Sequence, residues 1–89
     1  MTYFWLSFAD PDKPRGKQFL GGCVIEAESF PGAITEAHRL GCNPGGEVMG
    51  GMIEEQWERN IGEGKYPVGV LLAKSMIDEL DQKLNSKLN

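Results

Sequence analysis

A short turn between a predicted helix and a predicted strand contains the residues with the clearest potential for chemistry. The turn comprises Asn43, Pro44, Gly45, Gly46 and Glu47. Glycines let a ligand approach the backbone closely, and successive N–H groups in such a turn can form a concavity that binds anions. We expect the N–H groups of Gly45 and Gly46 to hold a phosphate or carboxylate, while the Asn43 amide contacts a base or a sugar hydroxyl. The same residues are also typical of a helix end followed by a tight turn, which binds nothing.

Basic and amide side chains elsewhere in the sequence could complete an anion site. Arg15 could bind a phosphate through two parallel hydrogen bonds, and Arg39 lies close in sequence to the glycine turn. Gln18 could contact the edge of a base. The alternatives are structural: Arg15 and Gln18 also fit a solvated hairpin loop, and Arg39 also suits the negative end of a helix.

Aromatic residues near the N-terminus could stack on a nucleobase, and we consider Trp5 and Phe8 for this role. Alternation along a strand places Tyr3, Trp5 and Ser7 on one face and Phe4, Leu6 and Phe8 on the other. Both faces are then apolar, so both must be covered. One helix can cover one face, and either the C-terminal helix or a neighbouring subunit must cover the other. An uncovered face would be an interaction patch, so we expect a homo-oligomer.

The sequence offers little for catalysis. His38 and Cys42 are four residues apart, but Gly41 is expected to turn the chain between them. The carboxylates show no recognisable paired arrangement, and Cys23 and Cys42 fit no metal-binding spacing. We therefore expect no enzyme, no metal and no cofactor, and we interpret both cysteines as reduced thiols of a cytosolic protein.

Composition narrows the class of protein further. The chain has 89 residues and a formal net charge of −4 at pH 7, and we interpret it as one domain spanning residues 1–89. The acidic balance opposes non-specific binding to nucleic acid, which needs a basic surface. No apolar run approaches the roughly 20 residues of a membrane span, and the N-terminus lacks the basic start of a signal peptide. These features indicate a cytoplasmic protein without a membrane partner.

Hydrophobic periodicity predicts the elements that must position these residues. Strands are predicted over residues 2–8, 18–28 and 47–55. A helix is predicted between Ser29, which can cap its start, and Gly41, which can end it in a left-handed conformation. The order predicts an α+β fold, a three-stranded antiparallel sheet (ββαβ) with one packed helix plus a C-terminal helix.

The C-terminal third is predicted as a turn-rich connector over residues 60–74 and a C-terminal helix over residues 75–88. Ser75 and Asp78 resemble a capping box at the start of this helix. A narrow apolar seam on the helix, expected to dock on the body or on a second copy, comprises Ile77, Leu80, Leu84 and Leu88.

Two glycine pairs fall inside predicted strands, Gly21-Gly22 and Gly50-Gly51. Glycine in a strand marks a bulge, close packing of another element, or a place where a ligand lies on the sheet. If both pairs lie at one level, they form a shallow ligand groove; otherwise they permit close packing of the helix.

Three runs of sequence, residues 5–11, 18–21 and 40–48, resemble those of a group of small uncharacterised proteins from bacteriophage and bacterial genomes. The resemblance covers roughly residues 3–53 and carries no settled activity, so it transfers no catalytic residue. It implies a short phage-type protein in the host cytoplasm. By analogy of size alone, such proteins include oligomeric sponges for the nucleotide signals of host immunity.

We therefore expect a non-enzymatic binding protein that sequesters a small phosphorylated ligand, a signalling nucleotide of host immunity, at a site shared between subunits. The alternative is a protein–protein interaction module that inhibits or adapts a host protein. It would bind through an apolar sheet face or the C-terminal helix.

Overall fold

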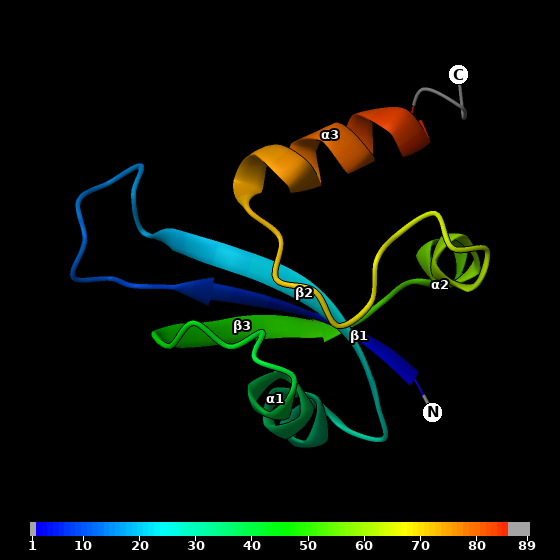
Figure 1. Ribbon diagram of the computed structural model, residues 1–89, viewed down its shortest axis with the longest axis horizontal. Coiled ribbons are helices and arrows are strands. Elements are labelled where there is room, and N and C mark those ends of the chain that lie inside the picture. Colours follow the sequence, from blue (N-terminus) through cyan, green and yellow to red (C-terminus); the bar gives the residue numbers. More distant parts are fainter. Residues whose placement is uncertain (1, 86–89) are drawn as a thin grey trace.

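The structure, a computed structural model, describes residues 2–85 and forms an α+β fold (Figure 1). Its elements are β1 (Thr2–Ala9), β2 (Phe19–Ala27), α1 (Phe30–Arg39), β3 (Glu47–Met52), α2 (Glu55–Gly62) and α3 (Lys74–Asn85). The sheet has the order β2-β1-β3, and β1 pairs antiparallel with both neighbours. The predicted antiparallel ββαβ arrangement with a C-terminal helix is confirmed.

Helix α1 covers one face of the sheet. The side chains of Phe4, Leu6 and Phe8 on β1 share a core with Ala33 and Ala37 on α1. Because the two helix residues are small, α1 can lie close to the strands. The Ser29 cap predicted for the start of this helix is also confirmed.

The ends of α1 follow the expected chemistry. The Ser29 hydroxyl accepts a hydrogen bond from the Gly32 N–H at 3.1 Å. At the other end, Gly41 adopts a φ of 76°, the left-handed conformation that terminates helices.

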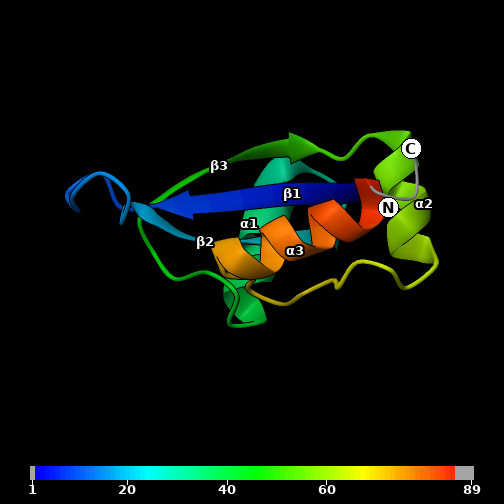
Figure 2. The same ribbon diagram turned by 90° about the horizontal axis from the view of Figure 1, so that it is seen from above.

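The second face of the sheet is covered by the C-terminal half of the same chain. Val24 on β2 forms a second core with Ile61 of α2 and with Tyr66 and Leu72, which lie in the segment 63–73 between α2 and α3. Trp5 and Ile77 pack against this core. Figures 1 and 2 show α3 on the side of the sheet opposite α1. The apolar second face is therefore covered within one chain. The homo-oligomer stays a prediction, but an uncovered sheet face no longer supports it.

Helix α2 was not predicted. The third strand, expected over residues 47–55, ends at Met52, and the connector expected to start at residue 60 begins inside a helix. The N–H groups of Trp57 and Glu58 both donate to the Glu54 carbonyl and open the helix. Trp57 and Ile61 are four residues apart, so they lie on one face and pack together into the second core.

Helix α3 begins one residue earlier than expected. Its first N–H donors, Met76 and Ile77, bond to the Ala73 carbonyl, so Ser75 lies inside the helix and the predicted capping box is wrong. In the predicted seam, Ile77 and Leu80 pack on the second core. The Leu84 side chain and Leu88 lie outside what the structure describes.

The two edges of the sheet differ. A bulge near the start of β2 shifts the register, so Leu20 packs against the α1-side core while Phe19 is partly exposed. Further along β2, Leu72 exchanges two backbone hydrogen bonds with Gly22, at 2.7 and 3.0 Å. This contact covers the outer edge of β2, while Met49 and Met52 on β3 are exposed.

Within residues 2–85, no helix has the length and apolar character required to cross a membrane.

Candidate functional site

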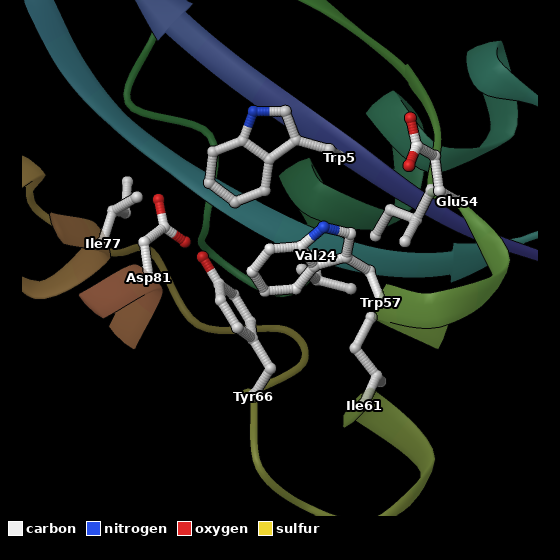
Figure 3. A pocket seen from close by; sticks show the side chains of 9 residues that line it. Trp5, Val24, Glu54, Trp57, Ile61, Tyr66, Ile77 and Asp81 are labelled. Atoms are coloured by element: carbon white, nitrogen blue, oxygen red, sulfur yellow. The ribbon is translucent and has the colours of Figure 1, made fainter. Parts of the chain in front are cut away.

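A pocket of about 450 Å³ lies between the sheet, α2 and α3. Three aromatic rings from three different segments form part of its wall: Trp5 of β1, Trp57 of α2 and Tyr66 of segment 63–73 (Figure 3). The Trp5 and Tyr66 rings meet at 83° with centroids 6.5 Å apart, and the Trp57 and Tyr66 rings meet at 87° with centroids 5.9 Å apart. Both indoles therefore stand nearly perpendicular to the phenol ring.

The sheet is shaped to accept the Trp5 indole. A Cβ atom added to Gly22 would lie 2.5 Å from the Trp5 ring, so a side chain there would displace the indole. The glycine thus has a packing role beneath the pocket wall. The remaining apolar lining comes from Val24, Ile53, Ile61 and Ile77.

Two carboxylates complete the lining, and they come from different elements. Glu54 immediately precedes α2, and Asp81 lies on α3. Figure 3 shows them on opposite sides of the two indole rings. None of the nine described side chains that line the pocket is cationic.

Asp81 and Tyr66 influence each other's ionisation. Burial and the negative charge of Asp78 raise the pKa of the Asp81 carboxyl. Burial and the charge of Asp81 raise the pKa of Tyr66 to about 12. The phenol therefore stays protonated at neutral pH, and its hydroxyl points toward the Asp81 carboxylate (Figure 3).

The aromatic residues predicted to stack on a ligand are separated by the sheet. Trp5 lines the pocket. Phe8 lies on the opposite face of β1 in the α1-side core and is fully buried. Its ring is enclosed by core side chains, so the expected stacking role of Phe8 is wrong.

The glycine turn has internal uses for the groups expected to hold an anion. The Gly45 N–H donates to the Asn43 side-chain oxygen at 2.9 Å, which forms a local turn. Gly46 has a φ of 74°, and a Cβ atom there would overlap the Ala9 carbonyl. These contacts favour the structural interpretation of the turn over the anion site.

The polar residues predicted around the turn also have structural partners. The guanidinium of Arg39 pairs with the Glu36 carboxylate, which raises the Arg39 pKa and lowers the Glu36 pKa. The Gln18 side-chain amide donates to the carbonyls of Pro11 and Lys13 and braces the hairpin loop. Arg15 is exposed in that loop.

The hairpin loop and the pocket lie far apart. Figures 1 and 2 place the loop at one end of the sheet and α2 at the other. The pocket therefore contains only Trp5 from the predicted ligand-binding set. Sequence reasoning missed Trp57, Tyr66 and the two carboxylates as site residues. The spacing of Trp57 and Ile61 was the one local signal for the pocket wall.

Both cysteines are buried, whereas the histidine is exposed. Cys23 and Cys42 are buried free thiols, and the Cys42 Sγ donates to the Gly69 carbonyl at 2.9 Å. His38 is exposed on α1. No cluster of metal-ligating side chains occurs in the described part of the chain.

No family model, curated protein or solved structure matches this sequence. The pocket is therefore the feature from which function is inferred.

Proposed function

We propose that this protein is a non-enzymatic binding protein that takes up a small organic ligand in the pocket between Trp5, Trp57 and Tyr66. The pocket itself carries the proposal. Its volume of about 450 Å³ lies within the range of small-molecule sites, which is roughly 300–1,000 Å³. Such sites combine a mainly apolar lining with a few polar groups that orient the ligand, and here Glu54 and Asp81 provide those groups.

A phosphorylated signalling nucleotide could occupy this pocket only with its phosphates outside the pocket. A base can stack on the Trp5 or Trp57 indole. A phosphate inside would meet two carboxylates and no lining cation. The pocket therefore favours an uncharged or cationic ligand. Sequestration of a host immune nucleotide remains a proposal with the base alone as the anchor.

Intrinsic fluorescence can test the proposal directly, because the two tryptophans of the chain both line the pocket. Calorimetric titration should use cyclic and linear nucleotides, nucleosides and small organic amines. We expect one class to release or absorb heat and to change tryptophan emission along the same saturation curve. Trp57→Leu should abolish both signals. Phe19→Leu, at an exposed aromatic residue outside the pocket lining, should leave them unchanged. Absence of binding by every class would contradict the proposal.

Protein–protein interaction is the second candidate, and the outer edge of β3 supports it. Met49 and Met52 on this strand are 71% and 72% exposed, and an open strand edge can pair with a strand of another protein. A pull-down from host lysate distinguishes the two candidates. A stoichiometric protein partner lost with Met49→Lys, and no co-purifying small molecule, would favour this function over the first.

A further inference from the structure

We propose that the ligand of this pocket is a small organic cation of the alkylammonium class, bound against the aromatic rings in the negative potential of the Glu54 and Asp81 carboxylates. The inference rests on the proposed function, because it names the ligand class of the same pocket. Three observations carry it: the orientation of the rings, the sign of the charged lining, and the apolar remainder of the wall.

The three rings that line the pocket can attract a cation. The face of an aromatic ring carries negative electrostatic potential and attracts a cation that lies within about 6 Å of its centroid. Trp5 and Trp57 each pack nearly perpendicular to Tyr66, so the pocket is lined by rings that lie in different planes. Aromatic rings in different planes allow the carbon substituents of one ammonium group to contact more than one ring.

The charged lining has one sign. Glu54 and Asp81 both line the pocket, and no cationic side chain is among its nine described lining residues. The salt bridges described within residues 2–85 involve other carboxylates. The Glu54 side chain makes no capping hydrogen bond to α2, so helix capping does not explain its carboxylate. A cation in the pocket would lie in the negative potential of both carboxylates. An uncharged ligand that covered the partly buried Asp81 carboxylate would leave its charge without compensation, which is unfavourable.

The apolar wall selects against a small hydrated metal ion. Four aliphatic side chains, Val24, Ile53, Ile61 and Ile77, share the lining with the rings. Hard metal ions need several oxygen ligands, and no cluster of three metal-ligating side chains occurs in the described residues. Carbon substituents on nitrogen would contact this wall and gain from leaving water.

The test compares choline with its uncharged carbon isostere, the alcohol in which a tert-butyl group replaces trimethylammonium. Tryptophan emission reports occupancy for both compounds. We expect saturable binding of choline to the wild-type protein and binding of the isostere at least about tenfold weaker, because the isostere lacks cation–π and carboxylate attraction. Equal binding of the two compounds would overturn the inference and leave the proposed function standing. Binding of a nucleoside, with no change in tryptophan emission on addition of choline, would likewise overturn the inference and leave the proposed function standing.

Matched variants separate the site from long-range charge. Asp81→Asn and Glu54→Gln should each weaken choline binding at least about threefold and leave binding of the isostere unchanged. Glu79→Gln removes one charge from the same helix at an exposed position outside the pocket lining, so it should leave choline binding unchanged. Unchanged choline binding in Asp81→Asn and Glu54→Gln would overturn the inference. Failure of every compound to bind would overturn the proposed function as well.

Discussion

Close packing within the chain accounts for two of the glycines inside the strands, Gly22 and Gly50. The indole of Trp5 occupies the space above Gly22, and the backbone of β1 lies against Gly50. Sequence reasoning offered a shallow ligand groove or close packing of the helix. The nearest atoms to an added Cβ at Gly22 and Gly50 belong instead to Trp5 and Leu6 of β1, so the packing that these two glycines permit is between neighbouring strands. Sequence could not decide between them, because a ligand and a neighbouring side chain impose the same demand for small size.

Gly50 provides a sharp test at the residue scale, because its neighbour Gly51 is a matched control. Gly50 has a φ of 155°, and a Cβ atom there would overlap the Trp5 carbonyl. We expect Gly50→Ala to lower the free energy of unfolding by about 2–4 kcal/mol. Around Gly51 no heavy atom lies within 4 Å of an added Cβ, so Gly51→Ala should change stability by less than about 1 kcal/mol. Urea denaturation followed by tryptophan fluorescence measures both variants. Equal losses would contradict this account of the packing.

At the scale of elements, the helices differ in how well local sequence encodes them. Helix α1 has an apolar stripe, a capping serine and a terminating glycine, and all three could be recognised. Helix α2 has eight residues, and its apolar pattern consists of Trp57 and Ile61 followed by glycines at 62 and 64. A helix this short depends mainly on tertiary contacts. Here Trp57 packs against Tyr66, which lies beyond the end of the helix.

The candidate site was less predictable than the fold because it too depends on tertiary contacts and not on a local sequence pattern. Its three rings come from a strand, a helix and a segment without regular structure, and Asp81 comes from α3. No local pattern relates these segments to one another. Trp5 was recognised because it lies in a strong strand pattern, whereas the role of Tyr66 depends on how residues 63–73 cross the second face of the sheet.

The two predicted serine caps give a matched pair of variants. The Ser29 hydroxyl accepts the Gly32 N–H, so Ser29→Ala should lower the free energy of unfolding by about 1 kcal/mol. Ser75 lies inside α3 and is exposed, and alanine is the better helix former, so Ser75→Ala should be neutral or stabilising by a few tenths, roughly 0–0.5 kcal/mol. Thermal unfolding by circular dichroism compares the two. A loss in Ser75→Ala as large as that in Ser29→Ala would instead support the capping box that the sequence suggested.

At the scale of the whole molecule, one sheet separates two cores built by one chain. Cys23, Phe4 and Leu6 lie in the α1-side core, and Val24 and Tyr66 lie in the second core. This arrangement removes the need for a partner to cover the sheet. Among the exposed large hydrophobic residues of the described chain, Met49 and Met52 of β3 have the highest exposed fractions. A homo-oligomer, if it forms, should therefore pair through β3, and the mass in solution measures its stoichiometry.

Each core also contains a group whose ionisation opposes folding at alkaline pH. Burial, with a smaller contribution from Cys42, raises the pKa of Cys23 from 9.0 to about 11. Burial and Asp81 raise the pKa of Tyr66 from 10.0 to about 12. Both groups are neutral when protonated, so the folded state keeps these protons to higher pH than the unfolded state does. Their contribution to stability is therefore complete below about pH 9 and is lost as pH rises toward about 11–12.

Urea denaturation under reducing conditions, from about pH 7 to about pH 11, tests this expectation. The free energy of unfolding should be level at first and should fall above about pH 9, because deprotonation first favours the unfolded thiol. Tyr66→Phe keeps the ring in the second core and removes the phenol hydroxyl. Its profile should therefore fall less steeply than that of the wild type above about pH 10, where the unfolded tyrosine ionises, while keeping the earlier fall caused by Cys23. A wild-type profile that stays level through about pH 11 would mean that solvent reaches both groups in the folded state, and it would contradict the burial of Cys23 and Tyr66 in their cores.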